Sequence, residues 1–562
     1  MEKQSLLGGR KKTSKRWTFL GIFVPLLLIG TLLLTYWPDL NKVSLDDECV
    51  QEPSYVPTGE RAAELNQRYE EYLTSSGFAD SAAKRFSGAI KIPTVSYDEM
   101  TAQVPQDPVS HKPFLEFHKY LEKSYPLVHQ RLEKHVVNEY SLVFYWKGSD
   151  ISLKPTMLMA HIDVVPVDPA TANEWKYPPF SGEIADGKVW GRGTADTKMS
   201  LIGILESVEA LLEVNYEPKR SVIVAFGHDE EITGFNGAQN IVKFIENNLA
   251  IPHHGVEMIL DEGMTLAIVE DPKIGVMKQR EITFANIGIA EKGYVNVNIS
   301  VSMDIGGHAS IAPQHTGIGI LSQVIVALEN NPFAPDLEES NPILKSLNCQ
   351  AAHTNKFSKR EKYILKHWKA FKHVLLKVFS ANPALNAAVT TSQAIDVIQG
   401  GVKVNALPQF SFEVANHRIA LHETVDTTLD HIYSLVRPIA KKNNLDFLPT
   451  PDTPRTKGTK GAISVNHLGF NPSPISPTDA SPYKVLSSVI RRVFPDSIVA
   501  PSLMTANTDT RWVWNLSESI FRFVPDISTG DEGIHTVNEN NSIENLVGIA
   551  RFYHELIRAF DE

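Results

Sequence analysis

The sequence predicts an α/β fold with a mostly parallel central sheet and helices on both faces. Strand-like and helix-like patterns alternate along the chain, in the order TMLMA, MSLIGILESVEALLEV, SVIVAFG, GAQNIVKFIENN and VEMIL. This alternation is typical of parallel strands joined by covering helices. Three of the apolar strands run directly into His, Asp and Glu residues. Because the carboxyl ends of parallel strands carry the chemistry of such folds, we expect a site at this edge of the sheet.

The composition fits a folded, mildly acidic protein. The 562 residues are 43% apolar and 21% charged, and this length allows two or more domains. The formal net charge of -11 leaves no broad basic field, so we expect no nucleic-acid partner. Cys49 and Cys349 are the only cysteines, which excludes a disulfide framework and a thiolate zinc cluster. One bridge between them is possible if the domain is luminal.

The N-terminus predicts a membrane anchor. Residues 17–37 carry no charge and have aromatic residues at both ends, as expected of a helix that spans a bilayer. Basic residues precede this segment and acidic residues follow it, so residues 1–16 should form a cytosolic tail. A cleaved signal peptide is the alternative, but the apolar run is longer than a usual signal core and no A-x-A site follows. We therefore expect a single-pass type II membrane protein with a retained signal anchor.

Beyond the anchor, changes in sequence texture mark the domain boundaries. The acidic, Pro-containing segment 38–60 is interpreted as a linker, and residues 61–289 as the first part of a catalytic domain. Near residue 290, YVNVNISVSM alternates with period two, like a half-exposed strand. We interpret residues 290–445 as an inserted α+β lid of the dimerisation type. The α/β texture resumes over 446–562, so the catalytic domain is predicted to be split in sequence.

Three candidate site residues lie at or after the strand TMLMA. His161 and Asp163 are two residues apart, so one imidazole can bind a metal while a carboxylate fixes its ring. A polar strand end without function is the alternative for this pair. Asp196 follows the Gly-rich turn GRGTAD at a predicted helix start. It can serve as a helix N-cap, and its carboxylate can also bridge two cations.

Two pairs of adjacent carboxylates follow the next apolar strands. Glu230 and Glu231 come after SVIVAFG, and Asp261 and Glu262 come after MIL, where either acid could supply a metal ligand. Neighbouring acids point in different directions, which suits one as a metal ligand and the other as a general base. A solvated acidic turn is the alternative for an isolated pair, but the flanking strands favour a site. This density of imidazoles and carboxylates indicates a divalent-metal hydrolase.

Two lone histidines are weaker candidates. His535 in GIHTVNE is a downstream imidazole, and His308 in GGHAS lies in the predicted lid. A single loop histidine is more often structural than functional. If the lid reaches the site, His308 could donate a hydrogen bond to a developing oxyanion.

Eight motifs, taken together and in order, resemble those of the M20 family of metallopeptidases: MLMAHIDVVPVD, WGRGTADTK, FGHDEE, LDEG, GGHAS, VKVNALP, TANTDTR and GIHTVNE. The resemblance covers the chain from about residue 60 to its end. Within the family it is greatest to vacuolar carboxypeptidases and next to secreted N-fatty-acyl-amino acid synthase/hydrolase enzymes. It implies two zinc ions per chain, with Asp196 as the bridge. The other ligands would be His161 and Glu262 for one zinc, and Glu231 and His535 for the second.

The resemblance also implies roles for the residues around the zinc ions. Glu230 would be the general base, and Asp163 would orient the imidazole before it. His308 would stabilise the oxyanion. Asn405 and Arg511 would hold carbonyl or carboxylate groups of the substrate.

We therefore predict a zinc-dependent metallocarboxypeptidase that hydrolyses the C-terminal peptide bond of peptides with a free C-terminal carboxylate. By the resemblance, it faces the lumen of a vacuole or lysosome-like compartment. An N-acyl amino acid hydrolase or synthase is the alternative, because it acts on an amide next to a free carboxylate. An inactive hydrolase scaffold in the membrane is less favoured, since no catalytic position is missing.

Short modification signals accompany this topology. Three N-x-S sequons are consistent with a glycosylated luminal body, at Asn298, Asn515 and Asn540. Lysines of the cytosolic tail could accept ubiquitin, but they are equally well explained as topology determinants. They are Lys3, Lys11, Lys12 and Lys15.

Overall fold

The computed structural model describes most of the chain beyond its N-terminal segment. The described residues are 44–59, 61–100, 109–272, 280–450 and 452–562. The predicted cytosolic tail and signal anchor, residues 1–37, lie outside them. Within the described ranges, no helix is both long enough and apolar enough to cross a bilayer.

The body of the protein is built on an eight-stranded sheet. The strand order is β1 (Glu133–Val137), β2 (Ser141–Trp146), β6 (Val222–Gly227), β3 (Thr156–His161), β7 (Met258–Asp271), β17 (Ile520–Ser528), β8 (Arg280–Glu291) and β16 (Ile498–Met504). The four central strands β6, β3, β7 and β17 run parallel. The sheet is nevertheless mixed, which corrects the prediction of a mostly parallel one. β1 and β2 form an antiparallel hairpin, and β8 folds back along β7.

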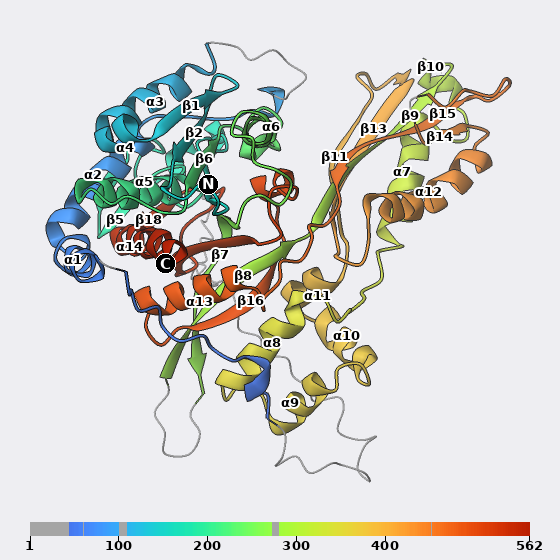
Figure 1. The fold of residues 1–562 in the computed structure, drawn as a ribbon. Helices are drawn as coiled ribbons and strands as arrows, with labels where there is room; N and C mark the ends of the chain where they lie inside the picture. Colours follow the sequence, from blue (N-terminus) through green and yellow to red (C-terminus); the bar gives the residue numbers. More distant parts are fainter. Residues whose placement is uncertain (1–43, 60, 101–108, 273–279, 451) are drawn as a thin grey trace, which may run out of the picture.

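Helices cover both faces of this sheet, as predicted. One face carries α1 (Ala62–Arg68), α2 (Ser76–Ile90), α3 (Lys112–Ser124), α4 (Pro126–Arg131), α5 (Lys198–Glu213), α13 (Ser481–Val493) and α14 (Ile543–Asp561), and the other carries α6 (Ala238–Asn247). Side chains of an inner strand alternate between the two faces. The helices on the two faces can be followed in Figure 1. In β3, Leu158 and Ala160 join the core under α5 and α14, whereas Met157 and Met159 join the core on the side of α6.

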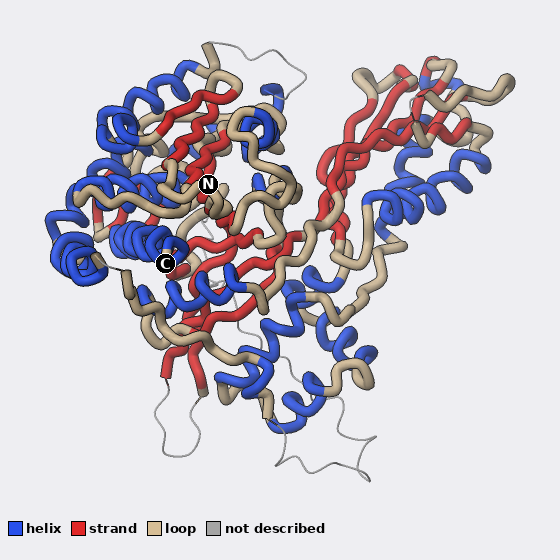
Figure 2. The backbone as a smooth tube through the Cα atoms, viewed as in Figure 1, coloured by secondary structure: helices blue, strands red, loops and turns tan. Residues whose placement is uncertain are grey.

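A second, five-stranded sheet forms the lid, which extends away from the body (Figure 2). Its strand order is β11 (Ser392–Gly400), β13 (Phe410–Ile419), β9 (Gly293–Met303), β15 (Gly461–Phe470) and β14 (Asp446–Leu448). Helices α7 (Gly317–Glu329) and α12 (Val425–Lys442) cover one face. In β9, Val295 and Val297 pack under these helices, whereas Tyr294 and Asn296 line a cavity on the opposite face. The segment with the period-two pattern is therefore a strand with one face packed under helices, as predicted.

The lid sheet continues beyond residue 445, where its end was predicted. β15 pairs with β9 along its whole length, from Gly461 opposite Met303 to Phe470 opposite Tyr294. The chain thus returns to the body only after Phe470. The irregular pattern of β15, whose second half reads NHLGF and is exposed or half-buried, gave no signal of this pairing.

Four helices within the predicted lid segment lie against the body instead. They are α8 (Pro342–His353), α9 (Lys359–Lys366), α10 (Lys372–Ser380) and α11 (Pro383–Val389). α8 packs beside β16 and β8, and residues 44–50 run past it. A disulfide joins Cys49 to Cys349 on α8, across 300 residues of sequence. The described part of the predicted linker is therefore fastened to the body.

Two small sheets hold loops that matter for the site. β18 (Asn540–Ser542), β5 (Lys188–Trp190) and β4 (Glu183–Ala185) form one of them, and β10 (Gly307–His308) pairs with β12 (Ala406–Leu407) in the other. The first lies in the body, next to the loops that carry Asp196 and His535. The second lies at the far end of the lid (Figure 1).

Candidate metal centre

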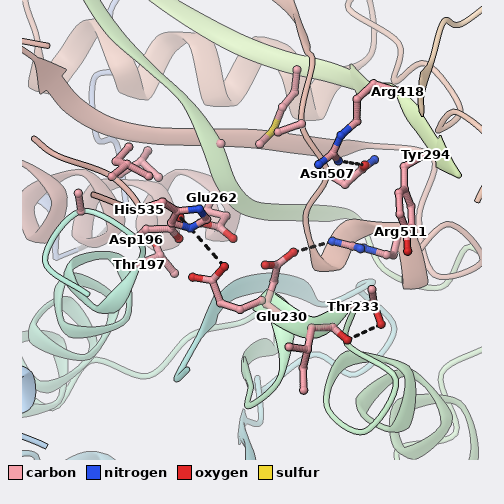
Figure 3. A pocket seen from close by; sticks show the side chains of 18 of the residues that line it. Asp196, Thr197, Glu230, Thr233, Glu262, Tyr294, Arg418, Asn507, Arg511 and His535 are labelled. Carbon is pink, nitrogen blue, oxygen red and sulfur yellow. Dashed lines mark hydrogen bonds and ion pairs between the residues drawn. The ribbon is translucent and has the colours of Figure 1, made fainter. Parts of the chain in front are cut away.

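The predicted metal ligands converge at the carboxyl ends of the central strands. His161 ends β3, Glu231 follows β6 in a short 3₁₀ turn, and Glu262 lies within β7. Donor atoms of His161, Asp196 and Glu231 lie within 4.8 Å of one another, and so do those of His161, Glu230 and Glu262. Asp196 and His535 arrive from loops far apart in sequence (Figure 3).

Asp196 lies between the two imidazoles. Its Oδ1 is 3.0 Å from His161 Nε2, and its Oδ2 is 3.1 Å from His535 Nε2. Glu262 Oε1 is 3.3 Å from His161 Nε2, and Glu231 Oε2 is 3.3 Å from His535 Nε2. Each imidazole therefore faces one oxygen of Asp196 and one oxygen of a glutamate. This is the arrangement of two adjacent cation sites that share one carboxylate.

Asp163 fixes the groups around it in two ways. The His161 Nδ1–H donates to the backbone carbonyl of Asp163 over 2.9 Å, which leaves the Nε2 lone pair facing the carboxylates. The buried Asp163 carboxylate accepts the N–H groups of Glu230 and Glu231, each over 3.1 Å, and the hydroxyl of Ser96 over 2.7 Å. It thus orients both the imidazole and the turn that carries the two glutamates.

The geometry favours Glu262 over Asp261 as the ligand after β7. Asp261 Oδ1 accepts the N–H of Glu262 over 2.9 Å, and only Glu262 reaches His161. The register of β7 against β17 shifts after the pair of Asp261 and Arg522, so Glu262 and Gly263 form an irregularity in the ladder. Such a bulge re-aims a side chain, and here it directs Glu262 into the site.

The electrostatics of the cluster call for a cation. Burial raises the pKa of Glu231 to about 8, that of Asp261 to about 7, and that of Glu262 well above its usual range. Glu231 Oε1 is buried without a hydrogen-bond partner among the described residues. The carboxylates in turn raise the pKa of His535 to about 10, so the cluster draws positive charge to this point, from protons or from a bound cation. The donor set of nitrogen and oxygen atoms fits a divalent metal.

Arg511 contacts the predicted general base. Its Nη2 lies 2.6 Å from Glu230 Oε1, and its Nε donates to the carbonyl of Thr508 over 2.7 Å. Both side chains are largely buried. Burial raises the pKa of Glu230, and Arg511 opposes that shift. The guanidinium therefore lines the cavity beside the candidate metal centre (Figure 3).

His308 and Asn405 are not brought to this site. They lie together at the far end of the lid, where the N–H of Ala309 donates to the carbonyl of Asn405 over 3.0 Å. The exposed His308 ring contacts Ser310 through Nδ1, over 2.7 Å. Neither residue lines the cavity next to the metal centre. For His308 or Asn405 to contact a substrate at the candidate metal centre, the lid would have to move, or the residues would have to come from another chain.

The base of the lid supplies site residues that the motifs did not reveal. The cavity next to the metal centre has a volume of about 930 Å³, and Tyr294, Arg418 and Asn507 line it. Arg418 Nη1 donates to Asn507 Oδ1 over 2.7 Å, and its guanidinium lies 5.7 Å from the centre of the Tyr294 ring. The one available signal was alternation in β13, which turns buried His417 to the helices and Arg418 to the other face.

The three sequons differ in exposure. Asn515 is exposed, and Asn298 is half-buried on β9. Asn540 is 2% exposed, and its Nδ2 donates to the carbonyls of Asp531 and Asn538. The prediction of a glycan on Asn540 is therefore wrong, because the folded protein leaves this amide no room.

Comparison with known proteins places these features in a family. Residues 157–559 match the sequence profile of peptidase family M20/M25/M40. Carboxypeptidase S of Saccharomyces cerevisiae is 34% identical, over 96% of this chain and 95% of its own length. N-fatty-acyl-amino acid synthase/hydrolase PM20D1 of Mus musculus is 36% identical, over 84% of this chain and 86% of its own length.

Solved structures share the fold. Human carnosine dipeptidase 1 superposes with a TM-score of 0.58 at 14% identity, covering 88% of this chain and 99% of that one. The metallo-carboxypeptidase Sso-CP2 of Sulfolobus solfataricus gives 0.57 at 18% identity, with coverage of 85% and 99%. At these identities the likeness concerns the fold alone.

Proposed function

The chain belongs to peptidase family M20/M25/M40, and from that premise we propose that it is a zinc-dependent carboxypeptidase that removes C-terminal residues from peptides. The observation that carries the proposal is the meeting of two imidazoles with three carboxylates at the edge of one cavity. The sequence similarity to carboxypeptidase S over nearly the whole chain supports the direction of the cleavage. An inactive scaffold is disfavoured, because every predicted ligand lies in the centre.

Two zinc ions fit the donor set. His161 and Glu262 would hold one, His535 and Glu231 would hold the other, and Asp196 would serve both through its two oxygens. Bound zinc supplies Lewis acidity, which makes water nucleophilic near neutral pH and polarises the scissile carbonyl.

The protein's own groups then move the proton. Glu230 follows β6 beside the ligand cluster. Its ion pair is with Arg511, and among the described residues it forms none with an imidazole. It accepts a proton from the attacking water and returns it to the leaving amine. Its ion pair with Arg511 keeps its carboxylate aimed at the cavity until substrate binds.

Positive charge at the cavity suits a substrate with a free carboxylate. Arg418 and Arg511 both line the cavity, one from the lid and one from the body. Each guanidinium can bind a carboxylate through two parallel hydrogen bonds. We therefore assign the C-terminal carboxylate of a peptide to this side of the cavity.

An N-acyl amino acid hydrolase or synthase is the second candidate. Two observations favour it: the 36% identity to the mouse enzyme and the apolar side chains in the same cavity, which include Val524, Leu468 and Ile534. An acyl chain could lie against these residues while the two guanidinium groups bind the amino acid carboxylate.

A substrate panel separates the two activities. The purified protein is offered N-blocked dipeptides and long-chain N-acyl amino acids, with and without a chelator. We expect chelator-sensitive release of the C-terminal residue from the blocked dipeptides. Efficient cleavage of only the N-acyl amino acids would overturn the first choice, and chelator-insensitive cleavage would overturn the metal centre.

The proposed setting is the lumen of a vacuole or lysosome-like compartment, with residues 17–37 as the signal anchor. The disulfide between Cys49 and Cys349 supports an oxidising environment for the body, because such bonds persist outside the cytosol. Residues 1–16 would then face the cytosol, where ubiquitin could attach to the tail lysines. Asn515 is the most exposed of the three sequon asparagines and so the best candidate for a glycan.

A further inference from the structure

Glu539 is a buried carboxylate outside the ligand set, and it touches the backbone that carries a ligand. Its side chain is 0% exposed. Its Oε1 accepts the N–H groups of Gly193, Ala195 and Asp196, over 3.0, 2.9 and 3.3 Å. Three amide dipoles of the loop before α5 thus converge on a single oxygen, which leaves the Asp196 side chain free to face the imidazoles.

The second carboxylate oxygen is also bound. Glu539 Oε2 pairs with the guanidinium of Arg192, whose side chain is 4% exposed. The backbone carbonyl of Glu539 accepts the N–H of Gly191 over 2.8 Å. The next residue, Asn540, pairs with Trp190 where β18 meets β5. The whole segment from Trp190 to Asp196 is therefore held by one short stretch of the C-terminal part of the chain.

The same stretch carries the second imidazole. His535 lies four positions before Glu539, in a loop closed by the N–H of Thr536 donating to the carbonyl of Gly533 over 3.0 Å. The His535 ring is half-exposed and reaches Asp196 Oδ2. Four side-chain hydrogen bonds of Glu539 thus join the Asp196 loop to the stretch that carries His535.

We propose that Glu539 is a positioning residue of the metal centre, which locks the loop of Asp196 to the loop of His535 so that both ligands meet one ion. The proposal rests on the metal centre proposed above. Glu539 itself binds neither metal nor substrate. It acts through three backbone amides and one buried guanidinium.

Replacing Glu539 with glutamine would disrupt these hydrogen bonds with little change in side-chain size. A carboxylate offers two acceptor oxygens, whereas a glutamine amide offers one oxygen and an NH₂ that can only donate. In Glu539→Gln, that NH₂ must face either the loop amides or the Arg192 guanidinium, all of which are donors. Groups that orient metal ligands typically change metal affinity by about 10–100-fold when they are removed.

The test is a zinc titration of the metal-stripped full-length protein in detergent, in competition with a fluorescent chelator. The matched control is Glu209→Gln. Glu209 on α5 also accepts two backbone N–H groups, from Leu127 and Val128 over 3.1 and 2.9 Å, and these belong to α4 away from the site. Thermal unfolding of the metal-free variants checks that each is folded. If Glu539→Gln does not fold, Glu539→Asp is titrated instead, because it keeps the charge but shortens the reach.

We expect Glu539→Gln to bind zinc about 10–100-fold more weakly than the wild type, with hydrolysis recovering at saturating zinc. Glu209→Gln should bind zinc like the wild type. Unchanged affinity in Glu539→Gln, or an equal loss in Glu209→Gln, would overturn the positioning role. A wild type that binds no zinc would instead refute the proposed metal centre, so the two failures are distinguishable.

Discussion

Glu231 in the body and Glu413 in the lid are both buried carboxylates whose pKa burial raises to about 8. Glu231 lies beside His535 and Asp196, in a cluster of donors that share one point. Glu413 lies on the face of β13 that packs under α7, and neither of its oxygens has a hydrogen-bond partner within the described ranges. A raised pKa therefore does not by itself mark a metal site. The neighbouring imidazoles, and donor atoms that converge on one point, distinguish Glu231 from Glu413.

The largest loss of activity is expected from substitution of Glu230, the proposed general base next to the metal ligands. Glu230→Gln removes the general base but leaves all five proposed ligands, so turnover should fall by about 10²–10⁴-fold. Zinc content should stay at the wild-type level. Steady-state kinetics and elemental analysis of the same preparation measure both. Near-normal turnover would show that another group accepts the proton.

Glu413→Gln should change stability and leave the metal centre alone. The folded-state pKa of Glu413 is about 8 against 4.5 for the exposed group, so the wild type is fully stabilised below pH 4.5 and loses stability as pH rises towards 8. The loss can reach about 4 kcal/mol. Glutamine cannot ionise, so the variant should lack this decline. Chemical unfolding at pH 5 and pH 8 checks it, and a decline that persists in the variant would assign the pH dependence elsewhere.

Removing the disulfide should cost stability without affecting zinc. Cys349→Ser removes the covalent link between the segment around Cys49 and α8, and this link spans 300 residues. A loss of about 2–4 kcal/mol in the free energy of unfolding is expected, because the cross-link restricts the unfolded chain. Urea unfolding measures it. Equal midpoints for the variant and the wild type would mean that the disulfide contributes nothing to the free energy of unfolding.

A smaller effect is expected at the base of the lid. Arg418→Met removes one guanidinium from the cavity, which should lower kcat/KM for substrates with a free carboxylate by about 10–100-fold, mainly through KM. Arg437→Met is the matched control, since Arg437 lies over the Phe447 ring in the lid and outside the cavity. An equal loss for amide-capped substrates would argue against carboxylate recognition by Arg418.

The body's part of the site could be predicted because each ligand lies in a short motif beside an apolar strand. His161, Glu231 and Asp196 required only the strand pattern and the family resemblance. The residues alone left Asp261 and Glu262 as alternatives, and only the family resemblance favoured Glu262, because the choice depends on the register shift between β7 and β17. No local pattern encodes such a bulge.

The lid's part could not be predicted for a different reason. Tyr294 and Arg418 come from separate strands and meet only through the pairing of β9 with β13, where they stand opposite each other. His308 lies in a recognisable motif, yet the fold holds it at the far end of the lid. Motifs therefore identified chemistry-bearing residues, and only the sheet register showed which of them share a cavity.

Zinc bound per chain is the measurement that tests the central claim most directly. Elemental analysis of the purified protein should give two zinc ions per chain, and Glu231→Gln should lose zinc and hydrolysis together while Glu413→Gln keeps both. The absence of bound zinc from the wild type, together with hydrolysis that survives a chelator, would contradict the assignment of this buried cluster as a metal centre.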